Sequence, residues 1–496
     1  LGDVYKRQGF RYKKQFGGRK MLEKIFKLKQ NNTTVKTEIL AGLTTFMTMA
    51  YIIALNPNLL TGFGAEGTKA LWNGVFLATC IASAVGMFVM AFLANKPFAL
   101  APGMGLNSFF AVVVANIVSI TGLSYVDSFQ AALCIILIEG ILFFILSIFN
   151  IRDKIVDAIP YGVRMGISPA IGLMLLNIGF GSNAGVYSKD GGPFYVMKDF
   201  FGALTPGLAK TNMTDGYSSM VLTVVTMFIG LFVIIILAHK GVNGAVLFGM
   251  LAACVVYWAA EAIFFGTNPF ASLATASFVP QFKDMADTTL FKFDFKDFIS
   301  IGWFTAISLI ITFCIIDMFD TIGTLVGTAS RAGMVDKEGN MPNMKEALIS
   351  DSVATMVGAV TGTSTVTTFV ESASGVEAGG RTGLTAFTTG ILFLACIFIA
   401  PLAAIIPAAA TSSALIYVGI LMLGGLKKVD FEDLSQVAPV ALMLIAMPIS
   451  GSIGHGIGLG LITYTVLKVF TGKAKEVSIL TYAISLLFLV KFFLVV

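Results

Sequence analysis

Long runs of apolar residues recur from one end of this chain to the other, and they constrain its fold more than any other feature. A helix of about 17–25 apolar residues is long enough to cross a lipid bilayer. Fifteen such segments can be marked between residues 37 and 495. Charged residues make up only 12% of the chain, whereas soluble domains carry roughly 25%. The sequence therefore predicts an all-α polytopic membrane protein and excludes a β-barrel, whose short spans alternate in polarity.

Cysteine and histidine are too few and too scattered to suggest a metal centre. The five cysteines lie inside apolar runs at unrelated spacings, and the chain has two histidines. Buried cysteines of this kind behave as small core residues. We therefore expect no metal site and no cofactor.

The N-terminal region differs from the rest of the chain. Residues 1–20 contain seven Lys or Arg and one Asp, and we interpret them as a lead foreign to the protein. Residues 21–36 form a basic amphipathic lead-in that suits the cytoplasmic membrane surface. Placing the N-terminus inside also puts the later basic loops on the cytoplasmic side, through the twelfth segment. Beyond the twelfth segment, the basic residues no longer fit a simple alternation of sides. Either residues 434–470 contain half-spans broken at P-I-S-G-S, or the last segment does not cross the membrane.

Two segments, 97–119 and 364–380, are rich in Gly, Pro, Ser and Thr, unlike the other apolar runs. They occupy the third and tenth positions, and an offset of seven inverts the second copy relative to the first. Paired broken segments in an inverted repeat indicate the substrate site of a secondary transporter. Irregular backbone at membrane depth survives only inside protein or beside a wet cavity. The pattern predicts a central site built from two broken spans.

In the third segment, KPFALAPGMGLNSFF, an extended piece is followed by a break at Pro102 and Gly103 and then by a half-helix. Asn107 lies one turn into that helix, whose free N–H groups and positive dipole suit carbonyl oxygens or anions. An amide side chain both donates and accepts hydrogen bonds, which suits a heteroaromatic ring edge. The alternative is close packing of small residues around one satisfied asparagine.

The eighth segment places Asp317 and Asp320 on one helix face within FCIIDMFDTIGT. A carboxylate at the centre of a membrane helix costs about 2.5–3.5 kcal/mol, so it indicates function. Asp320, beside the break-prone T-I-G-T, is the preferred working residue, and the pair could share a transported proton. The alternative is local capping by a neighbouring threonine. Glu139, within ILIEGILFF, is interpreted as a structural hydrogen-bond partner of a neighbouring span, with a proton relay as the alternative.

The tenth segment, TVTTFVESASGVEAGGRTG, repeats the order of strand-like piece, break and half-helix. Glu371 falls at the break, where the two halves of the site should meet. Glu377 stands four residues before Arg381, the favourable spacing for a helical ion pair. We therefore expect Glu377 and Arg381 to form a structural pair and Glu371 to face a ligand.

These motifs resemble one family. TEILAGLTTFMTMAYIIALNPNLL, APGMGLNSFF, DMFDTIGTL and TSTVTTFVESASGVEAGGRTGLTA are together similar to the nucleobase:cation symporter-2 family, in its adenine/guanine/hypoxanthine branch. The resemblance covers about residues 21–470. It implies about fourteen spans in a 7+7 inverted repeat, with a core domain (37–150 and 299–401) and a gate domain (160–266 and 404–496).

The resemblance also implies proton-coupled purine uptake across the inner membrane, and carries roles onto matching residues. Asp320, assisted by Asp317, would couple the proton. Asp320 would also bind the purine, together with Glu371, Asn107, Phe369 and Gly105. The first-span Gln-His pair of the uracil and xanthine branches is missing. A carboxylate acceptor favours guanine and hypoxanthine, with adenine as a further substrate. A homodimer through the gate domain is also expected.

Two rival functions remain at this point. An anion carrier of the related sulfate/bicarbonate folds would need a positive residue where this chain has Glu371. An intramembrane prenyltransferase-like enzyme would use the Asp-x-x-Asp of Asp317 and Asp320 with Mg²⁺, but it needs a second acidic cluster and basic diphosphate contacts. The sequence supplies neither of these, so we expect a transporter rather than an enzyme.

Overall fold

The structure, a computed structural model, describes residues 21–62, 64–149, 159–183, 217–331, 333–335 and 341–494. The basic lead of residues 1–20 lies outside the described residues, so its interpretation stays a prediction. Within the lead-in, residues 21–26 are helical, and Phe26 and Leu28 are buried in a cluster with Ala91, Leu384 and Ala386.

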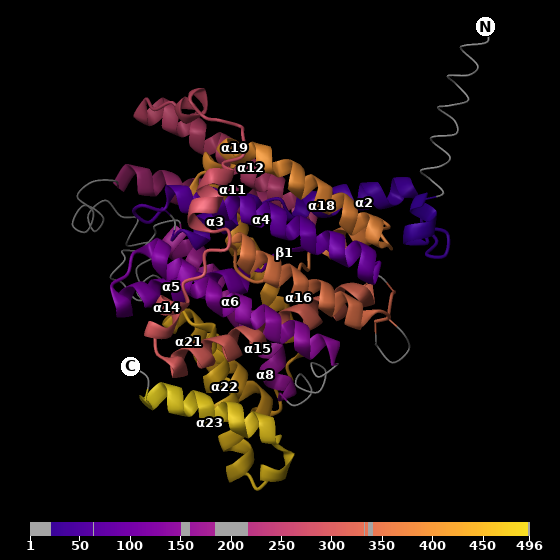
Figure 1. The fold of residues 1–496 in the computed structure, drawn as a ribbon, viewed down its shortest axis with the longest axis vertical. Helices are drawn as coiled ribbons and strands as arrows, with labels where there is room; N and C mark the ends of the chain where they lie inside the picture. Colours follow the sequence, from indigo (N-terminus) through magenta and orange to yellow (C-terminus); the bar gives the residue numbers. More distant parts are fainter. Residues whose placement is uncertain are drawn as a thin grey trace.

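The described chain is almost entirely helical (Figure 1). Its first helices are α2 (Val35–Met49), α3 (Ile52–Leu60), α4 (Lys69–Val89), α5 (Met104–Thr121), α6 (Tyr125–Ile148), α8 (Tyr161–Ile178), α11 (Tyr217–His239) and α12 (Ala245–Ala260). They are followed by α13 (Phe282–Thr288), α14 (Phe295–Ser300), α15 (Trp303–Arg331), α16 (Met344–Thr361), α17 (Ser372–Glu377), α18 (Gly383–Ala395), α19 (Ala400–Ala404), α20 (Ala408–Met422), α21 (Leu434–Ser450), α22 (Ile453–Phe470) and α23 (Ile479–Leu494). Short 3₁₀ or π turns are η1 (Met90–Ala94), η2 (Gly179–Asn183), η3 (Glu261–Phe265), η4 (Ala271–Ala274), η5 (Cys396–Ile399), η6 (Leu423–Lys428) and η7 (Ala474–Glu476).

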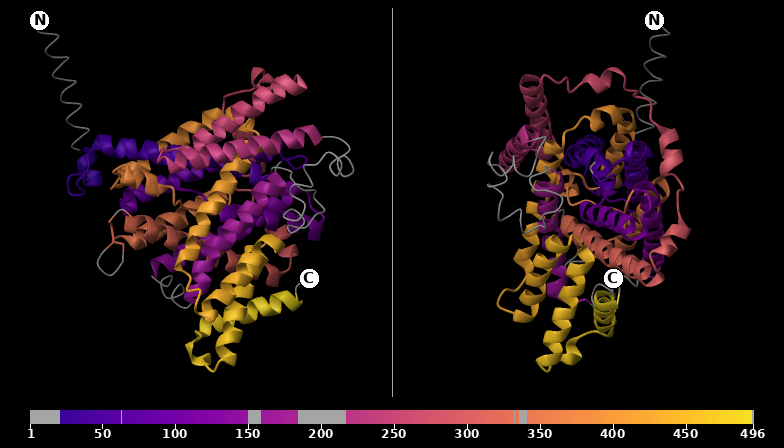
Figure 2. Two further views of the ribbon diagram at one scale, coloured as in Figure 1. Left: turned by 180° about the vertical axis from the view of Figure 1, so that it is seen from behind. Right: turned by 90° about the vertical axis from the view of Figure 1, so that its left-hand side faces the viewer.

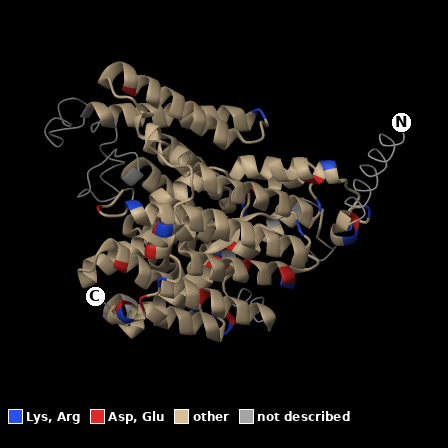
Figure 3. Cartoon of the chain, turned by 45° about the horizontal axis from the view of Figure 1, so that its top comes forward, with Lys and Arg blue, Asp and Glu red and all other residues tan. Residues whose placement is uncertain are grey.

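Within the described ranges, 11 helices are long and apolar enough to cross a membrane. Most of the chain carries no charge, and Lys, Arg, Asp and Glu appear as sparse patches (Figure 3). Large apolar side chains on the outside, such as Phe232 of α11 and Val255 of α12, are more than half exposed, as expected of a surface in contact with lipid. The chain is therefore a multi-pass membrane protein.

Several helices begin at a residue whose side chain caps the first turn. Thr34 accepts a hydrogen bond from the N–H of Thr37 at the start of α2, and Ser124 accepts one from Asp127 at the start of α6. Such caps satisfy backbone groups that the helix itself leaves unpaired.

The two broken segments meet at the centre of the molecule. β1 (Leu100–Pro102) pairs antiparallel with β2 (Val366–Thr368), with Ala101 opposite Thr367. The ribbon is extended by Phe369 N–H, which donates to Ala99 O at 2.9 Å, and by Gly103 N–H, which donates to Thr365 O at 3.1 Å. An extended segment within a membrane must pair its backbone groups, and each of these segments uses the other. As a result, α5 and α17 leave from opposite ends of one short ribbon.

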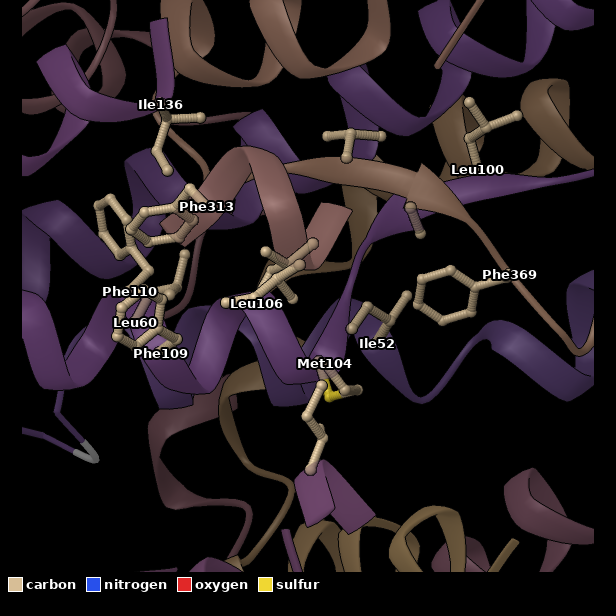
Figure 4. Packing of buried hydrophobic residues seen from close by; sticks show 14 of the residues in the cluster. Ile52, Leu60, Leu100, Met104, Leu106, Phe109, Phe110, Ile136, Phe313 and Phe369 are labelled. Carbon is tan, nitrogen blue, oxygen red and sulfur yellow. The ribbon is translucent and has the colours of Figure 1, made fainter. Parts of the chain in front are cut away.

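Aromatic side chains hold the first half-helix in place. Phe109 of α5 lies 4.7 Å from Phe313 of α15, centroid to centroid, and Phe110 lies 5.2 Å from Phe129 of α6. These rings belong to one large buried cluster (Figure 4). Because such pairs add about 0.5–1.5 kcal/mol beyond the burial of their surface, the helix that follows β1 is firmly positioned.

The C-terminal part forms one end of the molecule, and α11, α12 and α19 lie toward the other (Figures 1 and 2). α21 continues through Pro448 to Ser450, and Gly451, at φ +61°, turns the chain into α22. The turn therefore falls inside the P-I-S-G-S stretch, and α21 and α22 pack against each other as a hairpin. α23 follows and packs on α22.

Candidate functional site

Glu371 lies at the junction of β2 and α17, immediately before the half-helix. The hydroxyl of Tyr51 donates a hydrogen bond of 2.8 Å to Glu371 Oε1. Tyr51 directly precedes α3 and is 1% exposed, so packing fixes its ring. The half-buried Glu371 carboxylate is thus held from one side by a residue 320 positions away in the sequence.

Asp320 of α15 approaches the same place from the other side. Its Oδ2 lies 3.6 Å from where a Cβ on Gly103 would stand, directly before α5. α15 packs against both β2 and α17, and the carboxyl group of Asp320 is near enough to those of Asp351 and Glu371 for their charges to interact. Tyr417 of α20 is also within electrostatic range of Glu371. The structure therefore brings Asp320 and Glu371 together beside the starts of both half-helices.

A third acidic residue, Asp351 of α16, was not found from the sequence. Its Oδ1 accepts hydrogen bonds from the N–H of Thr368, at 2.9 Å, and from the Thr368 hydroxyl, at 3.1 Å. Its Oδ2 lies 2.9 Å from the hydroxyl of Thr321, which also lies 2.7 Å from Thr367 Oγ1. Asp351 therefore fixes β2 against α15. Its signal was one carboxylate within the otherwise uncharged run ALISDSVATM.

Asp317 belongs to this hydroxyl network rather than to the junction. It is fully buried, and its Oδ1 accepts a hydrogen bond of 3.2 Å from Thr321. The two aspartates of α15 thus have different surroundings: Asp320 is next to Gly103 and Glu371, whereas Asp317 is bonded within its own helix. This geometry favours the local alternative for Asp317 and the working role for Asp320.

Asn107 is buried, and both ends of its amide are occupied within the protein. Its Nδ2 donates to Asn56 Oδ1 at 2.7 Å and to Pro102 O at 3.1 Å. Its Oδ1 accepts a hydrogen bond from the hydroxyl of Ser364. Asn56 in turn donates to Thr363 Oγ1 at 2.9 Å. The amide therefore ties α5 to β1, α3 and the loop before β2, which favours the packing alternative over direct contact with a ligand.

Phe369 and Gly105 line the junction in different ways. Phe369 follows β2 and is 6% exposed, in the buried cluster that also contains Ile52 and Met104 (Figure 4). A Cβ on Gly105 would lie 2.8 Å from Ile171 Cγ2 of α8. Glycine at this position therefore permits the close approach of α5 and α8.

The structure does not bring Glu377 and Arg381 together. Arg381 Nη1 donates to the carbonyl oxygens of Val376 and Gly380, at 2.6 and 2.7 Å, and among the described residues it forms no ion pair with Glu377. α17 ends at Glu377, and Gly379 has φ +101°, so the helical spacing that the ion pair requires is lost. The guanidinium instead closes the turn after the half-helix.

Glu139 has a partner of the kind expected from the sequence. The hydroxyl of Thr365 donates to Glu139 Oε2 at 2.8 Å, which joins α6 to the residue before β2.

Within the described ranges, no group of three or more His, Cys, Asp or Glu side chains is arranged to hold a metal ion. The junction therefore offers carboxylates, one tyrosine hydroxyl and the N-terminus of α5 to an uncharged or proton-carrying ligand.

A sequence model described as "Permease family" matches residues 36–455. The chain belongs to this permease family. The permease is 36% identical over 477 residues to the adenine permease AdeP of Escherichia coli K12, covering 96% of this chain and 97% of that one. It is also 36% identical over 472 residues to the guanine/hypoxanthine permease PbuO of Bacillus subtilis 168, covering 95% and 100%. Membership places it among transport proteins rather than enzymes.

Among solved structures, the permease is similar to the transmembrane domain of the cyanobacterial bicarbonate transporter BicA. The TM-score is 0.58 at 16% identity, covering 86% of this chain and 97% of that chain. This likeness shows the fold alone and confirms the expected 7+7 class of transporter. The exact number of spans stays a prediction.

Proposed function

We propose that this permease is a proton symporter that imports purine nucleobases, most readily guanine and hypoxanthine, with adenine as a further substrate. The observation that carries the proposal is the convergence of Glu371 and Asp320 beside two half-helix N-termini. The names of its relatives, which include adenine and guanine/hypoxanthine permeases, agree with a purine.

In this mechanism the base docks against Glu371. Guanine presents two N–H donors, on N1 and on its amino group, and hypoxanthine presents one on N1, all of which suit a carboxylate acceptor. Tyr51 holds the acceptor in position. The backbone N–H groups at the start of α5 donate to the carbonyl edge. Phe369 gives an apolar wall beside the ring. Asn107 supports the junction and does not contact the base.

Asp320 carries the coupling proton. An ionised Asp320 beside an ionised Glu371 places two negative charges in a poorly solvated site, which is unfavourable. Protonation of Asp320 removes one of these negative charges. The site with a protonated Asp320 therefore binds the purine more tightly than the site with an ionised Asp320. This linkage couples downhill proton entry to purine accumulation.

Transport itself requires the site to open to either side. We assign residues 37–150 and 299–401 to a core domain that carries the ribbon, and 160–266 and 404–496 to a gate domain. Two observations support a site at their boundary: Gly105 packs against Ile171 of α8, and Tyr417 of α20 is within electrostatic range of Glu371. Movement of the core against the gate would then give alternating access. We place the N-terminus in the cytoplasm, the protein in the inner membrane, and a homodimer contact on the gate.

Anion transport is the second candidate, because the fold is shared with the bicarbonate transporter domain. The charge at the junction argues against it. Glu371 and Asp320 stand where a carried anion would need a cation, and two carboxylates repel a third negative charge. The similarity in fold to the bicarbonate transporter therefore does not support an anion as the substrate.

Reconstituted proteoliposomes test the proposal. Labelled guanine, hypoxanthine and adenine are supplied outside, with and without an inward proton gradient, and bicarbonate is tested in parallel. We expect purine accumulation that needs the gradient and collapses with a protonophore. Purine equilibration that ignores the gradient would contradict symport, and bicarbonate flux without purine flux would overturn the substrate assignment.

A further inference from the structure

A cavity of about 950 Å³ lies away from the junction, beside the N-terminal lead-in. Its described walls come from four separate parts of the chain: the stretch 25–32, the stretch 92–96, Arg381 after α17, and Gly333, Met334, Pro342 and Asn343 before α16. No step of the proposed transport mechanism uses this cavity.

Its charged lining residues are all cations. Lys27, Lys96 and Arg381 contribute to the walls, and no acidic side chain does so among the described residues. None of the three forms an ion pair with a described carboxylate. Arg381 donates hydrogen bonds to the turn only through its Nη1, so its other guanidinium N–H groups remain available to a ligand. Glu38 accepts the backbone N–H of Arg381 at 2.9 Å but does not line the cavity, so the described charges that face it are three cations, which attract an anion.

The walls are fixed by specific hydrogen bonds. Asn95 Nδ2 donates to Phe26 O at 3.1 Å and its Oδ1 accepts from Gly383 N–H at 2.8 Å, while Asn343 Nδ2 donates to Ala94 O at 3.2 Å. The rings of Phe26 and Phe92 stack 5.8 Å apart. The lead-in is therefore attached to the helical body, and the cavity is part of the fold.

Residues with a left-handed backbone conformation surround the same cavity. The described chain has five non-glycine residues with positive φ. Four of them line this cavity: Lys27, Asn32, Asn95 and Asn343. Three of the four are asparagines, which adopt this conformation more readily than other residues with a Cβ, and Asn95 and Asn343 use it where the chain leaves η1 and enters α16.

The rim of the cavity is apolar. Ile25, Phe92 and Leu93 line it and are 37%, 56% and 46% exposed. Phe92 and Leu93 stand at the end of a membrane span, where large exposed apolar side chains meet acyl chains. A ligand of this cavity therefore has an anionic head for the three cations and an apolar tail for the rim.

We propose that this cavity binds the headgroup of an anionic phospholipid from the surrounding bilayer, with its phosphate between Lys27, Lys96 and Arg381 and its acyl chains along Phe92 and Leu93. The site is independent of the proposed purine site. Free phosphate shares the headgroup chemistry but has nothing to place on the apolar rim, so the lipid is the ligand that the cavity fits.

Native mass spectrometry of the purified full chain tests this proposal. Phosphatidylglycerol and phosphatidylcholine with the same acyl chains are titrated separately, and bound lipids are counted. The wild type should retain one phosphatidylglycerol in preference to phosphatidylcholine. The double variant Lys27→Gln/Lys96→Gln should bind it about 25-fold more weakly, because each cation near an anionic headgroup contributes about fivefold.

The control is Lys24→Gln/Lys29→Gln, which makes the same change of charge in the same N-terminal segment at two exposed residues outside the cavity. It should keep affinity within about twofold. If the double variant folds poorly, the single variant Lys27→Gln takes its place, because Lys27 is exposed. Its affinity for phosphatidylglycerol should fall about fivefold.

A thermal-unfolding series separates the lipid from free phosphate. Phosphatidylglycerol should raise the melting temperature of the wild type, and inorganic phosphate at the same concentration should not. Equal stabilisation by inorganic phosphate, equal binding of the two lipids, or unchanged binding by Lys27→Gln and the double variant would each overturn the proposal.

Discussion

Replacing Tyr51 with Phe removes one hydroxyl and leaves the rest of the site in place. The ring is 1% exposed within the large buried cluster, so Phe fills the same volume. What is lost is the 2.8 Å hydrogen bond to Glu371 Oε1. Without it, the carboxylate is free to rotate away from the orientation that meets the purine.

The size of the effect follows from the kind of bond. A hydrogen bond to a charged group contributes about 1.5–3 kcal/mol, and we take this range as the contribution of Tyr51 to purine binding. Since 1.4 kcal/mol corresponds to a factor of ten, Tyr51→Phe should weaken purine binding by at least about tenfold and at most about 150-fold.

The assay is equilibrium binding of labelled guanine to the purified permease, with the melting temperature measured on the same samples. Tyr125→Phe is the matched control, because its hydroxyl donates to Leu60 O at 2.9 Å, a neutral backbone acceptor away from Glu371. The control should keep wild-type affinity. A folded Tyr51→Phe protein with affinity within twofold of wild type would refute the reasoning, as would an equal loss in Tyr125→Phe.

Three further predictions concern coupling and stability. Asp320→Asn should still bind guanine but lose the dependence of binding on pH, measured by titrating affinity between pH 5 and about pH 8; an unchanged pH profile would exclude it as the proton carrier. Asn107→Ala leaves its buried partners unsatisfied, at about 1–3 kcal/mol each, so the melting temperature should fall; an unchanged value would show that the network is not structural. Gly383→Ala should abolish folded protein because a Cβ there collides with the backbone of Ala91, whereas Gly424→Ala, with open space, should fold normally by size-exclusion chromatography; equal yields would contradict the packing.

The general architecture could be predicted because the bilayer imposes it. Apolar runs of fixed length specify spans, and Gly, Pro and Thr where Leu is expected indicate the broken segments. The position of Glu371 at the break of the tenth segment, with no cation at helical spacing to pair with it, predicts that it lies at the junction. The neighbouring T-I-G-T favours Asp320 over Asp317, and Asp320 lies beside Gly103, while its role stays a prediction.

What the sequence did not reveal depends on contacts between distant residues. Tyr51 reaches Glu371 across 320 positions, and Asn56 reaches Thr363 across 307. One-dimensional spacing carries no sign of either contact. The same limit explains Asn107, whose polarity suggested a ligand contact although its partners lie inside the protein. The Glu377 and Arg381 pair required a continuous helix, and the left-handed Gly379 interrupts it.

Purine accumulation by cells that lack their own purine uptake tests the central claim most directly. Cells expressing the full chain are supplied with labelled guanine, and Glu371→Gln is compared with Glu377→Gln, a matched change six residues away that is exposed and outside the junction. We predict that wild type and Glu377→Gln accumulate guanine while Glu371→Gln, present in the membrane at the same level, does not. Accumulation by Glu371→Gln at the wild-type rate would contradict the account.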